Sequence, residues 1–154
     1  MQSIIFQIEE KPIDKSKYIN KEVFYNDFVP SIASYVDNSK NREEDILWLI
    51  ESIKSYGVNY DSTRYSIIFN KGFKNNFFEC QFIKMKKLAN EITLDEFSEN
   101  NISGHKLYSL KKSIENKFGF YIYNSGYCQT LDEFVRSLAE EKTYYFGNTI
   151  IYHY

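Results

Sequence analysis

Apolar positions in the first forty residues predict one strand followed by an interrupted helix. Residues 2–9 alternate in the manner of a strand, which Pro12 closes. A helical segment is expected from about Asn20 and is interrupted at Pro30, because a proline removes a helical hydrogen bond and clashes with the preceding turn. Residues 35–36 would continue this helical segment, after the interruption, as a short second helical piece.

Residues 42–55 give the clearest helical pattern in the chain. Asn41 suits the N-cap position, with Glu44 three residues later, and Gly57 suits the end of the helix. The expected apolar face consists of Ile46, Leu49, Ile50 and Ile53, widened by Leu47 and Trp48. A face this wide predicts that the helix is well buried.

The middle of the chain is expected to contain a β-hairpin. Residues 64–70 and 76–85 would be its strands, with Asn70-Lys71-Gly72 as the turn. Alternation in the second strand places Cys80 between two phenylalanines on one face, and this predicts a core position for the cysteine.

Helices and strands also alternate in the C-terminal part. The expected elements are a short helix from Thr93, a helix from about Gly104 to Lys117, a strand at 120–123, a helix at 131–141, and a hairpin that pairs 144–146 with 149–152 across Gly147-Asn148. The sequence Thr-Leu-Asp-Glu-Phe occurs at 93–97 and again at 130–134, and each copy is a capping box. We interpret the repeat as two helices with the same start signal rather than as a duplicated binding element.

Together these elements predict an α+β fold with a largely antiparallel sheet and about four helices. The 154 residues have the length of one domain, so residues 1–154 are expected to form a single α+β domain. Strands and helices are interspersed without the regular alternation of a doubly wound fold.

Composition indicates the origin of the gene. Aromatic residues make up 18% of the chain, with 14 Tyr and 13 Phe, and Ile, Asn, Lys and Tyr are abundant. Because the codons of those four residues are rich in A and T, we infer a low-G+C bacterium, or a phage or mobile element that lives in one. Codon bias explains the tyrosines better than selection for an adhesive surface, although tyrosine gives large contact area at low entropic cost.

Charge is distributed unevenly along the chain. The net charge is −2, which gives no strong attraction to polyanions. Residues 64–117 carry a net charge of +4, between −4 in residues 1–63 and −2 in residues 118–154. The middle third is therefore the basic part of an acidic protein.

Several sequence features bear on location. The N-terminus lacks the charged start, the apolar run and the cleavage site of a signal peptide, and the longest apolar run, 46–50, is too short to cross a bilayer. The two cysteines show no recognisable spacing. We therefore expect a cytoplasmic protein with free thiols and no membrane partner.

Catalytic and cofactor motifs are not found. Cys128 lies two residues before the expected cap Thr130, where a helix N-terminus can lower a thiol pKa, and His105 or His153 could act as its base. A thiol enzyme is therefore the third hypothesis. The histidines and cysteines are too scattered for a metal site, and the six glycines lie singly, which excludes a glycine-rich phosphate loop. The leading expectation is no enzyme activity, no cofactor and no metal.

A local excess of cations supports nucleic-acid binding as the second hypothesis. Within residues 64–87 the only acid is Glu79, and the cations are Arg64, Lys71, Lys74, Lys84, Lys86 and Lys87. Interleaved phenylalanines could stack on bases while the lysines hold phosphates. In the alternative interpretation the phenylalanines are core residues and the lysines line a solvated hairpin edge.

Protein binding is the leading hypothesis, since a small chain rich in Tyr and Phe that lacks catalytic motifs acts through contacts. Its acidic and basic thirds would give a partner electrostatic complementarity. Acidic residues such as Glu43, Glu44 and Asp45 would face a basic partner. A nucleoprotein complex as partner, and a homodimer formed through the strand that ends at residues 152–154, stay open.

In size and composition the chain resembles small accessory proteins of phages and mobile elements in low-G+C bacteria. Many of those proteins inhibit host defence nucleases, as anti-CRISPR and anti-restriction proteins do. The resemblance includes no motif, so it assigns no residue. It implies a non-enzymatic inhibitor that acts by covering the surface of its partner.

Overall fold

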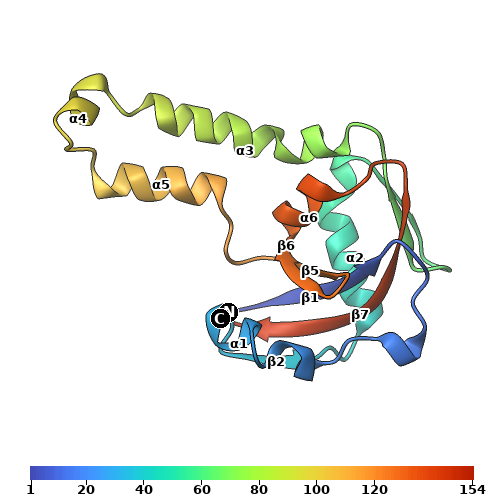
Figure 1. Ribbon diagram of the computed structural model, residues 1–154. Coiled ribbons are helices and arrows are strands. Elements are labelled where there is room, and N and C mark those ends of the chain that lie inside the picture. Colours follow the sequence, from blue (N-terminus) through green and yellow to red (C-terminus); the bar gives the residue numbers. More distant parts are fainter. The chain divides into compact units, whose positions relative to one another are not determined.

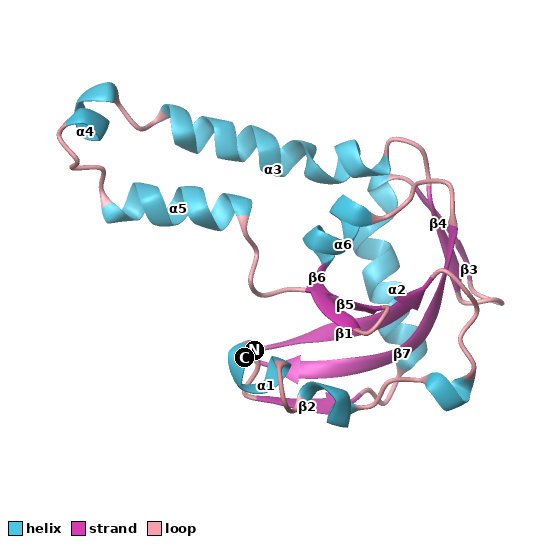
Figure 2. Ribbon diagram, viewed as in Figure 1, coloured by secondary structure: helices cyan, strands magenta, loops and turns pink.

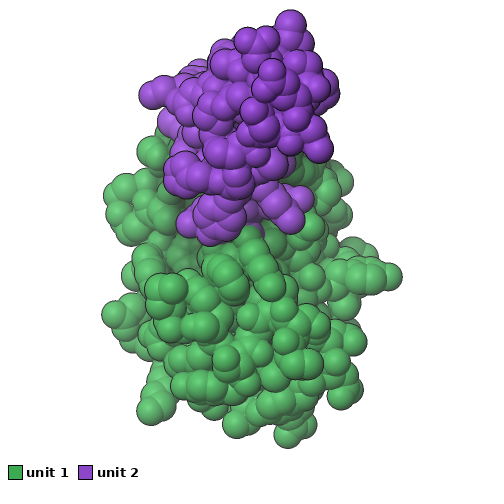
Figure 3. Space-filling model, turned by 90° about the vertical axis from the view of Figure 1, so that its left-hand side faces the viewer, with its two compact units in different colours: residues 1–74, 117–154 green, residues 75–116 purple.

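A computed structural model describes residues 1–154 and shows an α+β fold (Figure 1). Seven strands form one mostly antiparallel sheet, accompanied by six α-helices (Figure 2). The predicted fold class is confirmed. The chain divides into two compact units, with residues 1–74 and 117–154 in unit 1 and residues 75–116 in unit 2 (Figure 3). The single domain expected from chain length stays a prediction.

All strands of the sheet belong to unit 1. They are β1 (Gln2–Glu9), β2 (Tyr35–Asn38), β3 (Val58–Asp61), β4 (Ser66–Phe69), β5 (Tyr121–Asn124), β6 (Tyr127–Thr130) and β7 (Thr143–His153). Their order is β3-β4-β7-β1-β5-β6, and β2 also pairs with β7. The pair β1–β5 is parallel, whereas β7 runs antiparallel to β1, β2 and β4. The strand β7 therefore pairs with three strands from the first half of the chain.

Most helices begin at side chains that cap their first turn. The α-helices are α1 (Phe28–Ser31), α2 (Arg42–Ile53), α3 (Phe73–Asn90), α4 (Leu94–Ser98), α5 (Gly104–Ile114) and α6 (Leu131–Ser137), and the 3-10 turns are η1 (Lys15–Lys17), η2 (Lys21–Phe24) and η3 (Lys54–Tyr56). The side chain of Asn41 accepts from the Glu44 amide at 3.3 Å, as predicted. Thr93 and Thr130 form the predicted capping boxes of α4 and α6. None of these helices combines the length and apolar character needed to cross a bilayer.

The core of unit 1 contains an aromatic cluster and the inner face of α2. In the cluster, Phe28 packs edge-on against Tyr121 and Tyr152, with ring centroids 4.9 Å and 5.2 Å apart. The helix α2 lies against the sheet (Figure 1) and buries the predicted residues Ile46, Leu49, Ile50 and Ile53. Each such side chain stabilises the fold by roughly 1.5–3 kcal/mol relative to exposure.

The outer face of α2 differs from the prediction. Leu47 and Trp48 are about half exposed, so the helix is buried on one face only. The Trp48 ring still contacts Phe120 edge-on, with centroids 5.4 Å apart. The helix is therefore amphipathic rather than buried on all sides.

The hairpin predicted for residues 64–70 and 76–85 is wrong in its second half. Its first strand is β4, but residues 76–85 lie within the 18-residue helix α3. No glycine or proline interrupts residues 73–103, so nothing stops the helix where the second strand was expected. Cys80 is consequently exposed rather than in the core.

The C-terminal hairpin and the second helical piece are also wrong. Residues 143–153 form the continuous strand β7, in which Gly147 is a strand residue and not part of a turn. Residues 35–36 lie in β2, which pairs with the end of β7. The strands β3 and β6 were not predicted, and α5 and α6 end earlier than expected.

Candidate interaction surface

Unit 2 is an antiparallel helical hairpin. The Gln81 side chain on α3 donates to the carbonyl of Ile114 at the end of α5, at 3.2 Å. The Lys106 ammonium near the start of α5 donates to the carbonyl of Glu91 just after α3, at 2.9 Å. The two helices therefore run in opposite directions, and α4 forms the tip between them (Figure 1).

The hairpin exposes half of its large apolar side chains. Of residues 75–116, the small polar Ser113 is the single buried residue. The unit holds 42 of the 154 residues but seven of the fifteen large exposed hydrophobic side chains: Phe82, Ile83, Leu94, Phe97, Leu107, Tyr108 and Ile114. This amount of exposed apolar surface on one unit makes it a candidate interaction site.

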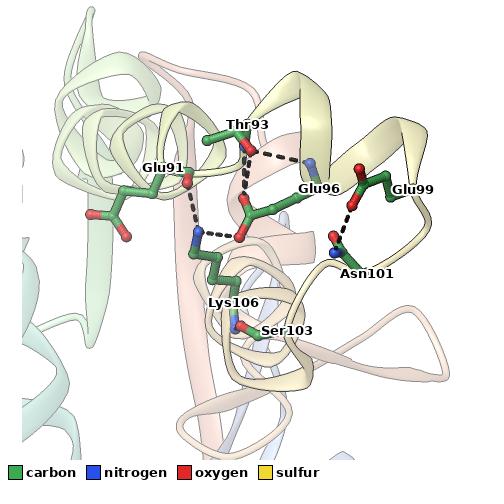
Figure 4. A network of polar contacts seen from close by, with 7 residues as sticks. All are labelled: Glu91, Thr93, Glu96, Glu99, Asn101, Ser103 and Lys106. Carbon is green, nitrogen blue, oxygen red and sulfur yellow. Dashed lines mark hydrogen bonds and ion pairs between the residues drawn. The ribbon is translucent and has the colours of Figure 1, made fainter.

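A network of polar contacts fixes the tip of the hairpin (Figure 4). One carboxylate oxygen of Glu96 accepts from the Thr93 amide at 2.8 Å, which completes the capping box of α4. The other accepts from the Lys106 ammonium at 2.7 Å, and the same ammonium reaches the Glu91 carbonyl. The hydrogen bond from Lys106 is the main cause that holds the pKa of Glu96 below its ordinary value. The ends of three helices are thereby tied together.

Two apolar side chains project from this fixed tip. Leu94 is 79% exposed and Phe97 is 71% exposed. They stand three residues apart on the single turn of α4 and therefore share one face. Because the backbone that carries them is already ordered, binding a partner through them would incur a smaller entropic cost.

The repeated capping sequence gives a direct comparison for these two positions. In the second copy, Phe134 is 3% exposed and packs against Phe69 and Tyr144 of the sheet. In the first copy, Phe97 lies on the surface of a unit that has no comparable core. The exposure of Leu94 and Phe97 was not predicted from the sequence. The same five-residue sequence also begins α6, in which Phe134 is buried.

Charge is segregated along the hairpin. The acidic tip, residues 88–105, contains no Lys or Arg and carries the acids Glu91, Asp95, Glu96 and Glu99. The basic band, residues 80–87 and 107–114, contains no acid and carries Lys84, Lys86, Lys87, Lys111 and Lys112. In this band the Lys86 ammonium lies 5.4 Å from the Phe82 ring centroid, and that of Lys112 lies 5.9 Å from the Tyr108 centroid. Each region thus combines one sign of charge with exposed apolar groups.

The six cations singled out in the sequence are divided between the two units. Lys84, Lys86 and Lys87 are exposed on α3 and belong to the basic band. Arg64, Lys71 and Lys74 belong to unit 1, where the Lys74 ammonium donates to the Arg136 carbonyl at 3.1 Å. The expected hairpin surface therefore does not exist, but three of its lysines join Lys111 and Lys112 on the helical unit.

The acidic residues Glu43, Glu44 and Asp45 lie in the first turn of α2, where they suit the helix dipole. Glu43 accepts from the Tyr65 hydroxyl. Glu44 accepts from the Asn41 side chain at 2.8 Å, and Asp45 accepts from the Thr149 hydroxyl at 2.6 Å. Each carboxylate thus makes a contact within unit 1.

Cys128 lies on β6 and packs against the aromatic cluster of unit 1. Burial raises the pKa of its thiol to about 12, and the nearby carboxylate of Glu133 acts in the same direction. This is opposite to the lowering expected near a helix N-terminus. The thiolate that a nucleophilic cysteine needs is therefore disfavoured at this position.

Metal-ligating side chains do not converge anywhere in residues 1–154, where no group of three His, Cys, Asp or Glu could hold an ion. The tip and the basic band of unit 2 each combine exposed apolar side chains with charge of one sign. No family model, no curated protein and no solved structure matches this chain.

Proposed function

We propose that this chain is a non-enzymatic protein-binding protein and that unit 2 is its contact element. The observation that carries the proposal is the set of seven large apolar side chains exposed on one helical hairpin. A partner that covered them would gain roughly 25 cal/mol for each Å² of apolar surface removed from water. The hydrogen-bonded tip would present Leu94 and Phe97 to that partner in a fixed geometry.

In its more specific form the proposal is a cytoplasmic inhibitor encoded by a phage or mobile element. It would cover a host defence nuclease, in the manner of anti-CRISPR and anti-restriction proteins. Support comes from the acidic tip, because proteins that bind nucleic acid present basic surfaces to phosphates. Such a surface would be complementary to Asp95 and Glu99, and an apolar depression within it would accept Phe97. The A/T-biased composition supports the bacterial origin.

The first test is affinity capture of the tagged chain from a low-G+C bacterial lysate, with and without nuclease treatment. We expect a protein partner that survives nuclease treatment and is lost with the double variant Leu94→Ser/Phe97→Ser. Tyr127→Ser is the matched control, because Tyr127 is equally exposed but belongs to β6 of unit 1. Capture that is unaffected by the double variant would contradict unit 2 as the contact element.

Nucleic-acid binding is the second candidate, and the basic band is the observation that favours it. Phe82 and Tyr108 lie beside lysines there, an arrangement that suits stacking on bases with phosphates held nearby. Replacing Lys84, Lys86 and Lys87 by Gln should then weaken binding to single-stranded DNA and flatten its salt dependence. Binding to single-stranded DNA that is unchanged in this triple variant would remove the candidate.

A further inference from the structure

We propose that the helical unit pairs with the same unit of a second copy of this chain, in an antiparallel two-fold dimer. The inference rests on the proposed function, since it names one partner for the surface on which that function depends. It follows from how charge and apolar groups are placed along the hairpin.

The two helices of unit 2 do not bury their apolar side chains against each other. Helices bury their apolar faces against another element, and here only Ser113 is buried among residues 75–116. A stable dimer buries about 800 Å² on each partner, which involves about 20–30 residues. One face of a 42-residue hairpin can supply that area.

The basic band occupies one level of the hairpin. The contacts of Gln81 with Ile114 and of Glu91 with Lys106 fix the alignment of α3 and α5. Residues 84–87 therefore lie beside residues 109–112. All five lysines thus lie within about one helical turn of one another along the axis of the hairpin. The acidic tip, residues 88–105, follows directly on this level toward the end of the hairpin.

This spacing makes the surface complementary to itself. In a two-fold interface the same patch is used by both copies, so any contact between tip and band occurs twice. An antiparallel pair would set the acidic tip of each copy on the basic band of the other. Leu94 and Phe97 would then meet the apolar groups of the band, among them Phe82 and Leu107.

The opposite arrangement is disfavoured by charge. A parallel pair would place the acidic tips together and the lysines together, and like charges in contact oppose association. Charge therefore selects both the direction and the register of the pair. An unrelated protein partner, by comparison, would need a basic and an acidic region of its own at the matching spacing.

The experiment is sedimentation velocity of the full chain at 1–200 µM, in low and high salt. The expected result is a species of twice the 18.4 kDa chain mass that dissociates on dilution and more readily in high salt. Leu94→Ser/Phe97→Ser should raise the concentration at which half of the chains are dimeric by at least tenfold. Tyr127→Ser should leave that concentration unchanged. A chain that is monomeric throughout would overturn the inference.

Charge reversal tests the register. Variant A carries Lys84→Glu, Lys86→Glu and Lys87→Glu, and variant B carries Glu91→Lys, Asp95→Lys and Glu99→Lys, which leaves only Glu96 acidic in the tip. Each alone should be monomeric, because its tip and band have the same sign. An equimolar mixture should restore a dimer, because both contacts between A and B again join opposite charges. A mixture that stays monomeric, or variants that dimerise alone, would overturn the proposed pairing.

The two proposals fail in different ways. A monomeric wild-type chain whose captured partner is still lost with Leu94→Ser/Phe97→Ser would overturn the dimer and leave the proposed function intact. Restoration of the A–B dimer also shows that both variants are folded, so a monomer of either alone supports the inference.

Discussion

Gly147 lies so close to Gln7 that no side chain fits between them. A Cβ atom at position 147 would lie 2.6 Å from the Cδ atom of Gln7 and 2.9 Å from its Cγ atom. The Gln7 amide is fixed in place, because it donates to the Lys17 carbonyl and accepts from the amides of Ile19 and Asn148. A glycine in the middle of a strand therefore marks the close approach of a buried polar side chain.

Gly147→Ala should lower the free energy of unfolding by about 1–3 kcal/mol, because Gln7 must move and lose hydrogen bonds to admit the methyl group. Urea unfolding monitored by tyrosine fluorescence measures the change. Gly104→Ala is the control, since open space surrounds its Cβ position. Equal stability of the two variants would show that Gln7 is free to rearrange.

Arg42→Lys should destabilise unit 1 by about 1.5–3 kcal/mol. The guanidinium donates to the carbonyls of Phe146 and Gly147, and it lies 4.1 Å from the Tyr65 ring centroid. Lysine keeps the charge but cannot reproduce the planar, two-donor contact. The same urea titration on Arg64→Lys, an exposed arginine, should show a change below about 0.5 kcal/mol. A matching loss in both variants would contradict the role assigned to Arg42.

Cys80 should be alkylated by iodoacetamide at pH 7.5 while Cys128 reacts far more slowly. A thiol pKa raised from 9.0 to about 12 leaves roughly a thousandfold less thiolate at this pH. Mass spectrometry of the labelled peptides distinguishes the two sites, and Cys80→Ser isolates Cys128. Rapid labelling of Cys128 in the folded chain would revive the thiol-enzyme hypothesis.

The tip of unit 2 should lose stability in acid. The folded-state pKa of Glu96 lies below the ordinary value of 4.5, so its contribution is present above pH 4.5 and is lost as the pH falls through the lowered value. An NMR titration of the Glu96 carboxyl should give a midpoint below 4.5, and Lys106→Met should raise that midpoint. A wild-type midpoint at or above 4.5 would mean that the Lys106 contact is absent in solution.

Local start signals were sufficient to predict several helices. Asn41, Thr93 and Thr130 cap their helices as expected, because capping depends on side chains within three residues of the cap. The inner stripe of α2 was equally clear from a period of three and four residues. These features depend on sequence neighbours alone.

The errors arose where distant residues decide the structure. Gly147 looks like a turn residue until Gln7 and Arg42 are placed beside it. Phe78 and Cys80 alternate as in a strand, but the helix continues through them to Asn90, since residues 73–90 contain no glycine or proline. The candidate surface could not be predicted for the same reason: the exposure of Phe97 depends on which elements cover it, and its sequence context matches that of buried Phe134.

The central position of β7 has a consequence for synthesis on the ribosome. Residues 2–9, 35–38 and 66–69 all pair with β7, so the sheet cannot close until residues 143–153 have emerged. Unit 2, in contrast, is continuous in sequence and helical, and segments rich in local contacts form quickly. Until translation reaches β7, the strands that pair with it keep unpaired edges, and unpaired strand edges are prone to aggregation.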